Sequence, residues 1–163
     1  PAGWFCDFDH ASLYAAAKQQ KQREKQRRVA RKELKEKVMG EDRRHQLKLT
    51  ERAVKEFVLL RDKNKPCISC GSNEGRWNAG HYRSKGAAPH LRFNTRNLHK
   101  QCVQCNMSKS GNLLEYRSGL IERYGVEFVD NLEADNEPAK WTLDAIKAIR
   151  PYYRMMCKRL ETI

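Results

Sequence analysis

Two Cys-x-x-Cys pairs constrain this chain more than any other feature of its sequence. Cys67 and Cys70 form the first pair, and Cys102 and Cys105 form the second. A pair at this spacing grips one metal ion from a tight turn, and two pairs complete the closed four-thiolate site of structural zinc. Disulfides are the alternative, but nothing marks the chain as secreted, which favours metal. We therefore predict a structural Zn²⁺ ion held by all four cysteines.

The segment between the two pairs is long enough to hold a β-hairpin. Residues 77–82 and 91–98 are predicted to form paired strands, and the turn-rich stretch 84–89 is the loop between them. A short helix is predicted after Cys102, and Gly111 ends it. This order of strand, strand and helix places one polar side chain on each element, namely His81, Asn97 and Asn106.

The same order resembles the HNH, or ββα-metal, endonucleases. In that family a histidine on the first strand is the general base, a middle asparagine orients it, and a histidine or asparagine on the helix binds a divalent cation. The resemblance implies these three roles for His81, Asn97 and Asn106. It implies a Mg²⁺ or Mn²⁺ ion in addition to the structural zinc.

Longer motifs resemble the NinG (Rap) recombination proteins of lambda-like phages. They are Pro-Cys-Ile-Ser-Cys-Gly, Ala-Gly-His-Tyr-Arg, Leu-Arg-Phe-Asn, His-Lys-Gln-Cys-Val-Gln-Cys-Asn and Lys-Ser-Gly-Asn-Leu. The likeness covers most of residues 50–160 and, more loosely, the basic N-terminal part. It implies a structure-specific endonuclease that acts on branched recombination intermediates such as Holliday junctions and D-loops.

The chemistry of phosphodiester hydrolysis suits these residue types independently of the resemblance. A neutral histidine with a pKa near its unperturbed value of about 6.5 accepts a proton from water at cytoplasmic pH. A divalent ion polarises the phosphate and holds the leaving 3′ oxygen, and the amide oxygen of Asn106 is a hard ligand for it. Asn97 is expected to hydrogen-bond the His81 imidazole and fix its tautomer. The alternatives for His81 are a structural histidine and a substitute zinc ligand, although four cysteines already complete the zinc site.

One position departs from the HNH pattern. Gly80 stands where most members carry an Asp or His that ligates the catalytic ion, so the ion must take another oxygen. His99 is a further candidate ligand or phosphate contact, and a polar strand residue is the equal alternative. Because of this departure, the alternative hypothesis is a non-catalytic zinc module that binds junction DNA through shape and backbone charge. A sequence-specific HNH nuclease of the homing or restriction type is the third hypothesis for the function.

The charge of the chain points to nucleic acid. Its net charge is +13 and its isoelectric point is near 9.7. Residues 11–39 predict one long polar helix, and ten Lys or Arg stand against three Glu between Lys18 and Lys37. Such a helix has no apolar seam and is expected to be solvated or ordered on DNA. The side chains expected to contact DNA are Arg27, Arg28, Arg31, Arg83, Lys85, Arg92, Lys100 and Lys109.

We predict a mostly helical α+β protein with a zinc-stapled ββα-metal core, flanking helices and a long basic N-terminal helix. Residues 1–45 are the basic segment and residues 46–163 are the nuclease domain, with its core at 63–111. Residues 46–62 form the first flanking helix. Asn112 is expected to cap the next one with Glu115, and Thr142 to cap the last.

The remaining expectations concern partners and location. Cutting both strands of a junction requires two symmetric nicks, so a homodimer is expected. No apolar run is long enough to span a membrane and no signal peptide is visible, so we expect the cytoplasm of a bacterial host. Cys6 and His10 are either half of a second zinc site or part of a frayed terminus. Pro151 is expected to kink or split the last helix.

Overall fold

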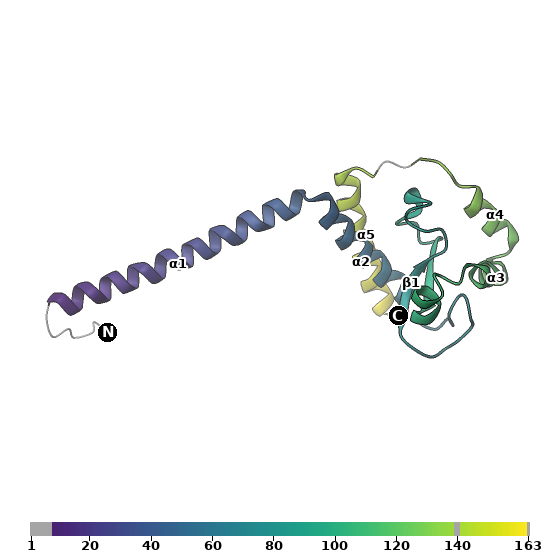
Figure 1. Ribbon diagram of the computed structural model, residues 1–163, viewed down its shortest axis with the longest axis horizontal. Helices are drawn as coiled ribbons and strands as arrows, with labels where there is room; N and C mark the ends of the chain where they lie inside the picture. Colours follow the sequence, from purple (N-terminus) through teal and green to yellow (C-terminus); the bar gives the residue numbers. More distant parts are fainter. Residues whose placement is uncertain (1–7, 139–140, 163) are drawn as a thin grey trace. The chain divides into compact units, whose positions relative to one another are not determined.

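The computed structural model describes residues 8–138 and 141–162, in two units that divide after Asp42 (Figure 1). The first unit is the helix α1 (Phe8–Glu41), which continues through Gly40 to its last residue. Its apolar side chains Leu13 and Leu34 are more than 60% exposed, at 66% and 62%. The expected polar helix is therefore present, and packing within its own unit does not hold it. Cys6 lies outside the described residues.

The second unit contains a two-stranded antiparallel sheet and four α-helices among its described residues. In the register of the sheet, Trp77 lies opposite Cys102 and His81 lies opposite Leu98. The elements in chain order are α2 (Arg43–Arg61), β1 (Trp77–His81), the 3-10 helix η1 (Pro89–Leu91), β2 (Leu98–Cys102), the π-helix η2 (Gln104–Ser108), α3 (Leu113–Tyr124), α4 (Val126–Ala134) and α5 (Leu143–Glu161).

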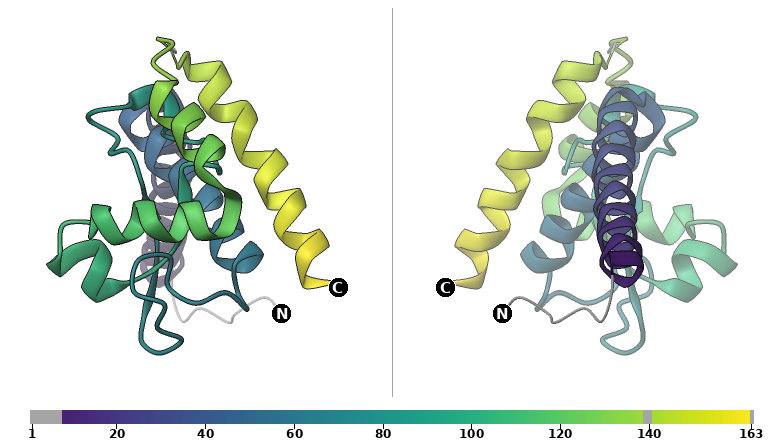
Figure 2. Two further views of the ribbon diagram at one scale, coloured as in Figure 1. Left: turned by 90° about the vertical axis from the view of Figure 1, so that its right-hand side faces the viewer. Right: turned by 90° about the vertical axis from the view of Figure 1, so that its left-hand side faces the viewer.

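Two apolar clusters cover the sheet. Helices α2 and α5 lie side by side (Figures 1 and 2), and their side chains meet Ala79 of β1 and Leu98 of β2. The second cluster joins α3 and α4 to Ile68 of the first cysteine pair. Tyr116 of α3 is buried and donates its hydroxyl to the Gly80 carbonyl over 3.0 Å. Every residue of β2 is buried as a result.

The second strand begins later than the sequence predicts. Residues 91–97 were expected to be strand, but two successive turns occupy them. The N–H of Asn94 donates to the carbonyl of Leu91 over 3.1 Å, and that of Asn97 donates to the carbonyl of Asn94 over 2.9 Å. These local bonds use backbone groups that a sheet would need, so Asn97 precedes β2 instead of lying on it.

An ion pair at the end of α2 ties this helix to β2. Asp62 is fully buried and accepts from Arg61 over 2.6 Å, from Lys65 over 3.2 Å and from the backbone N–H of Lys100 over 3.2 Å. The Arg61 guanidinium also donates to the carbonyl of Leu98 over 2.8 Å. Burial by itself would raise the pKa of Asp62, but its bonds and charge pairing with Arg61, and then Lys100 and Lys65, lower that pKa to about 2.

The helix caps are partly as expected. Thr142 accepts from the Ala145 N–H over 3.2 Å, which confirms the cap of α5. Asn112 is the N-cap residue of α3, as expected, but it adopts a left-handed conformation and its side chain makes no cap bond. Its Nδ2 donates to Cys105 Sγ over 3.6 Å instead. Helix α5 continues through the exposed Pro151 and is not split. None of the described helices combines the length and apolar character needed to cross a bilayer.

Candidate functional site

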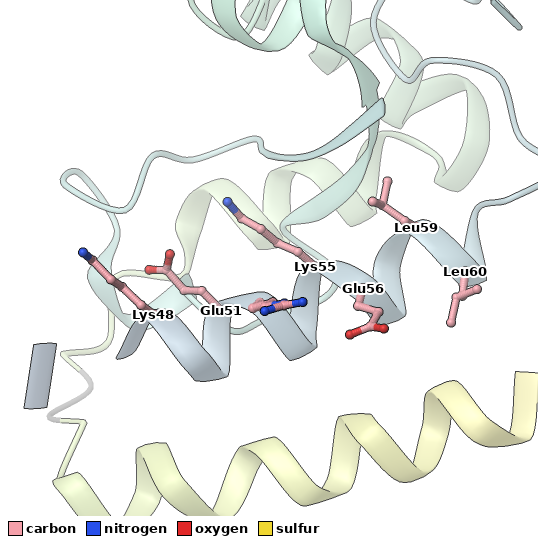
Figure 3. Close-up of a pocket in the computed structure, with 7 residues that line it drawn as sticks. Lys48, Glu51, Lys55, Glu56, Leu59 and Leu60 are labelled. Atoms are coloured by element: carbon pink, nitrogen blue, oxygen red, sulfur yellow. The ribbon is translucent and has the colours of Figure 1, made fainter. Parts of the chain in front are cut away.

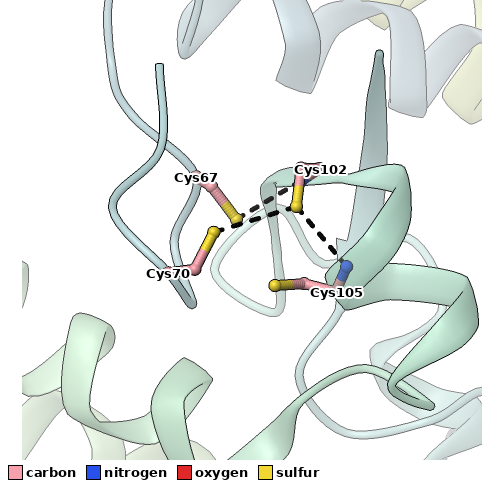
Figure 4. A group of neighbouring side chains, drawn as sticks. All are labelled: Cys67, Cys70, Cys102 and Cys105. Atoms are coloured by element: carbon pink, nitrogen blue, oxygen red, sulfur yellow. Dashed lines mark hydrogen bonds between the residues drawn. The ribbon is translucent and has the colours of Figure 1, made fainter. Parts of the chain in front are cut away.

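The four predicted zinc ligands come together at one point. The Sγ atoms of Cys67, Cys70, Cys102 and Cys105 all lie within 4.8 Å of one another (Figure 4). The Cys70 and Cys102 sulfurs are 3.8 Å apart. Four sulfurs at about 2.3 Å from a tetrahedral Zn²⁺ would be about 3.8 Å apart, so this geometry fits zinc. The arrangement can hold one closed structural metal centre.

Backbone N–H groups prepare this site for thiolates. Burial disfavours a charged sulfur at Cys67, yet hydrogen bonds from the backbone at Cys102, Cys70 and Ser69 lower its pKa to about 7. Burial raises the pKa of Cys105 to about 12, and the adjacent Cys102 and Cys70 sulfurs add to the rise. A cation is what allows all four sulfurs to be thiolates at neutral pH.

Close packing holds the turn of the first cysteine pair, residues 67–70 (the first knuckle), against α3. A Cβ on Gly119 would lie only 1.9 Å from the backbone oxygen of Ile68, so the helix approaches the knuckle more closely than any other residue type permits. Gly71 follows Cys70 with a φ of 70°, the left-handed region that glycine adopts most easily. The four-cysteine cluster is thus connected directly to the apolar cluster that contains Ile68.

His81 ends β1 with one ring nitrogen already committed. Its Nε2 lies 3.0 Å from the backbone carbonyl of Arg92. A carbonyl only accepts, so Nε2 carries the proton and the neutral ring keeps its lone pair on Nδ1. A half-buried imidazole with a fixed tautomer and one basic nitrogen is what a general base requires.

The surroundings of His81 keep it neutral. Burial lowers the pKa of His81 below 6.5, and the positive charges of Lys55 and Lys85 lower it further. The hydrogen bond to the Arg92 carbonyl and the charge of Glu51 oppose this shift without reversing it. The imidazole is therefore in its basic form at neutral pH.

The structure gives Asn97 partners other than the expected imidazole. Its Oδ1 accepts from the Arg83 N–H over 2.8 Å, and its Nδ2 donates to the carbonyls of Arg83 over 2.9 Å and Leu91 over 3.4 Å. Both donors of the amide are thus used on the loop between the strands. Asn97 is completely buried and holds this loop closed, whereas the Arg92 carbonyl performs the orienting task predicted for Asn97.

Asn106 lies beside the position that departs from the HNH pattern. It belongs to η2, and its Oδ1 lies 2.9 Å from where a Cβ of Gly80 would be. The strand position and the helix position that share the catalytic ion in that pattern are therefore neighbours here. The amide oxygen of Asn106, a hard ligand, faces this point, and the Oε1 atom of Gln101 lies there as well.

His99 has a structural environment. Its ring is 1% exposed, its Nδ1 lies 3.2 Å from the Tyr116 hydroxyl, and Tyr124 packs against it. Burial first, and then the charge of Arg61, lower the pKa of His99 to about 3. A buried, neutral ring held between two tyrosines fits the alternative of a core residue better than a ligand or phosphate contact.

The side chains predicted to contact DNA separate into three groups. Lys100 and Arg83 form the first group, because both are bound within the protein. Lys100 is buried, donates to the Lys63 carbonyl over 2.9 Å and lies over the Trp77 ring, so it is not available to a phosphate. The Arg83 guanidinium donates to backbone carbonyls of residues 132, 133 and 135, which cap the end of α4. The exposed members are Arg27, Arg28, Arg31 and Lys109.

Lys85 and Arg92 form the third group, because both pair with one carboxylate. Glu51 of α2 lies 3.1 Å from Lys85 Nζ and 3.2 Å from Arg92 NH1. The same stretch of α2 lines a surface groove of about 580 Å³. Lys48, Glu51 and Lys55 project to one side of the helix there, and Glu56 projects to another (Figure 3). The positive charges near His81, those of Lys55 and Lys85, are therefore followed along α2 by that of Lys48.

Comparison with known proteins follows the same residues. The family model described as Bacteriophage Lambda NinG protein matches residues 2–162. The chain belongs to the NinG family. Protein ninG of Escherichia phage 933W is 39% identical over 171 residues, which cover 97% of this chain and 85% of that protein. No solved structure matches the chain.

Two further NinG relatives match a shorter stretch of the chain at higher identity. The ninG proteins of Salmonella phage P22 and Escherichia phage lambda are each 48% identical over 120 residues, which cover 73% of this chain and 59% of each relative. The membership confirms the family that the motifs resemble. The NinG name describes no chemistry, so the relationship to HNH enzymes stays a prediction.

Three residues near the site were missed from the sequence. Glu51 and Lys55 lie on a helix that was expected only to pack on the core. Gln101 lies between the predicted ligands His99 and Cys102 and had no predicted role of its own. A helical wheel of α2 would have placed Glu51 and Lys55 on one face, four residues apart. The position of Gln101 follows only from the strand register, which the sequence did not predict correctly.

Proposed function

We propose that the chain is a metal-dependent, structure-specific DNA endonuclease of the HNH type. The observation that carries this is the state of His81, which is neutral, fixed by the Arg92 carbonyl and close to the positive charges of Lys55 and Lys85. A basic nitrogen among cations is suited to activating water next to a phosphodiester. Asn106 lies nearby on η2 and supplies an oxygen for Mg²⁺ or Mn²⁺.

The reaction follows from these positions. Nδ1 of His81 takes a proton from water, and the resulting hydroxide attacks phosphorus in line with the 3′ oxygen. The bond between phosphorus and the 3′ oxygen breaks, which leaves a 5′ phosphate, and the 3′ oxygen takes a proton from solvent. Lys55 and Lys85 stabilise the added negative charge on the phosphate. When bound, the divalent ion supplies Lewis-acid stabilisation of the leaving oxygen. The Nε2–H bond to the Arg92 carbonyl stabilises the imidazolium that forms.

Branched DNA is the proposed substrate because of family membership and not because of the site. The matching model spans residues 2–162, and the motifs that resemble the recombination family fall inside it. The exposed basic helix α1 adds backbone contacts without base readout. A homodimer is proposed for paired nicks, and native mass measurement on a four-way junction tests it. A species with only one chain per junction would contradict the dimer.

Cleavage and binding measured together test the function. Zinc-loaded protein is incubated with a labelled four-way junction, a D-loop and linear duplex, each with Mg²⁺, Mn²⁺ or EDTA. We expect cleavage of the branched substrates only, and only with Mg²⁺ or Mn²⁺. Equal cutting of linear duplex at fixed sequences would instead support a restriction-type nuclease.

A second candidate has one observation in its favour. Gly80 has no side chain to ligate a catalytic ion, so a zinc module that binds junctions without cutting them fits this position. Such a module would bind branched DNA in a salt-sensitive way and leave it intact with every metal. The parallel binding measurement separates it from the nuclease.

A further inference from the structure

Gly80 leaves room on one face of the sheet, and a side chain from the neighbouring strand fills it. Gln101 pairs with Asn78, so Gly80 is its diagonal neighbour on the same face. A Cβ on Gly80 would meet Gln101 Oε1 at 2.2 Å and Asn106 Oδ1 at 2.9 Å. Two amide oxygens therefore converge where the HNH pattern carries an acidic or histidine ligand.

The orientation of the Gln101 amide is determined by its other end. Nε2 donates to Ser69 Oγ over 2.7 Å and to the Gly111 carbonyl over 2.6 Å. The carbonyl of Gly111 only accepts, so nitrogen must face it and Oε1 must face Gly80. Gln101 is 0% exposed, and its Oε1 accepts no hydrogen bond from the described residues. A buried amide oxygen without a partner is unfavourable, and a bound cation would satisfy it.

We propose that Gln101 Oε1 and Asn106 Oδ1 are protein ligands of the divalent ion, and that Gln101 replaces the ligand missing at Gly80. The proposal rests on the proposed nuclease function. Amide oxygens are hard ligands suited to Mg²⁺ and Mn²⁺, which commonly complete their shell with water and substrate phosphate. Two neutral ligands bind the ion weakly, so phosphate oxygens of DNA would complete the site.

The same geometry explains why position 80 is a glycine. Any side chain there would place its Cβ on the Gln101 oxygen, and Gln101 has little freedom to withdraw because Ser69 and Gly111 hold its nitrogen. Gln101 can occupy this position only because residue 80 is a glycine, so the two residue types depend on each other. An acidic ligand on β1 is exchanged for an amide ligand on β2.

One other arrangement would also satisfy the Gln101 oxygen. If the Asn106 amide is turned, its Nδ2 donates to Gln101 Oε1 and no ion is needed. The two arrangements predict opposite effects of Asn106→Asp. A carboxylate strengthens a cation site, whereas it places an acceptor against an acceptor if Asn106 is only a donor.

Mn²⁺ binding to zinc-loaded, DNA-free full chain tests the proposal, with free Mn²⁺ followed by electron paramagnetic resonance. Asn106→Asp is expected to bind one Mn²⁺ at least tenfold more tightly than wild type. Asn64→Asp, in the exposed turn after α2, is the matched charge control and is expected to stay within twofold. Affinity of Asn106→Asp no greater than that of Asn64→Asp would overturn the proposal.

The contribution of Gln101 is measured in the tighter background. Adding Gln101→Met to Asn106→Asp keeps the side-chain length, removes the oxygen and is expected to weaken Mn²⁺ binding at least fivefold. Gln104→Met, at an exposed position of η2, is the matched control. Equal affinity with and without Gln101→Met overturns the role of Gln101. If that variant loses its zinc, Gln101→Ala in the Asn106→Asp background replaces it, and the same fivefold loss of Mn²⁺ affinity is expected.

These outcomes are independent of the outcome for the nuclease function. The binding assay contains no DNA, and His81→Ala is expected to leave Mn²⁺ affinity within twofold of wild type. Metal-dependent cleavage without the predicted Mn²⁺ effects would retain the nuclease and reject these two ligands. Conversely, the predicted Mn²⁺ effects without any cleavage would retain the ion site and reject the nuclease.

Discussion

Asp62 is the buried charge that anchors α2 to β2, and Asp62→Asn removes that charge with little change in shape. Its pKa falls from 3.8 to about 2 in the folded chain. At ~1.4 kcal/mol per pKa unit, this shift corresponds to ~2.5 kcal/mol of stability at neutral pH. The substitution also leaves Arg61 without its partner at 2.6 Å. We therefore expect the free energy of unfolding to fall by about 3 kcal/mol at pH 7.

Urea unfolding of the zinc-loaded protein, followed by circular dichroism, measures this effect. Asp130→Asn is the control, because the Asp130 carboxylate is 59% exposed beside Arg117 and its removal is expected to change nothing measurable. A loss below 1 kcal/mol for Asp62→Asn at pH 7 would refute the assignment of a stabilising buried charge.

The pH dependence of the difference has a fixed sign. The folded pKa of Asp62 lies below its unfolded value, so the stabilisation is complete above about pH 4 and disappears as the pH falls towards 2. The comparison is made over the part of this pH range in which both proteins keep their zinc by atomic absorption. A difference that stayed constant as the pH fell below 4 within that range would contradict the assignment of Asp62 as the titrating group.

Three further predictions concern the zinc, the packing beneath it and the base. Purified protein is expected to contain one zinc per chain by atomic absorption, and chelation is expected to abolish the cooperative unfolding of residues 43–163, whereas Cys157→Ser keeps the metal. Gly119→Ala places a Cβ 1.9 Å from the Ile68 carbonyl oxygen and is expected to destabilise by at least about 2 kcal/mol in urea, whereas Gly86→Ala, with its nearest atom at 3.9 Å, is neutral. The cleavage rate is expected to fall on the acid side with an apparent pKa below 6.5, because the pKa of His81 is lowered and only the neutral ring is active; an apparent pKa above 7 would argue against this base.

The four-cysteine cluster could be predicted from the sequence because Cys-x-x-Cys spacing is itself a geometric constraint. Four sulfurs in two such pairs have few arrangements that satisfy them, and the structure brings all four within 4.8 Å. The basic helix was predictable for a similar reason, since its composition excludes a buried face. These features depend on local sequence alone.

The strand register was not predictable, and the site depends on it. Residues 91–97 have strand-like composition, but Asn94 and Asn97 form turns there and β2 starts at Leu98. The register places Gln101 diagonally across from Gly80, a relation between residues 21 positions apart that no local pattern encodes. The partner of His81 was missed for the same reason, because the Arg92 carbonyl comes from a loop expected to be strand.

The proposed role of His81 is tested most directly by comparing wild type with His81→Ala in single-turnover cleavage of a four-way junction with Mg²⁺ or Mn²⁺. His10→Ala, at an exposed position of α1, serves as the matched histidine control. If His81 is the general base, His81→Ala keeps junction binding and zinc content unchanged and loses roughly 10²–10⁴-fold in cleavage rate. Cleavage by His81→Ala within threefold of wild type would contradict His81 as the base.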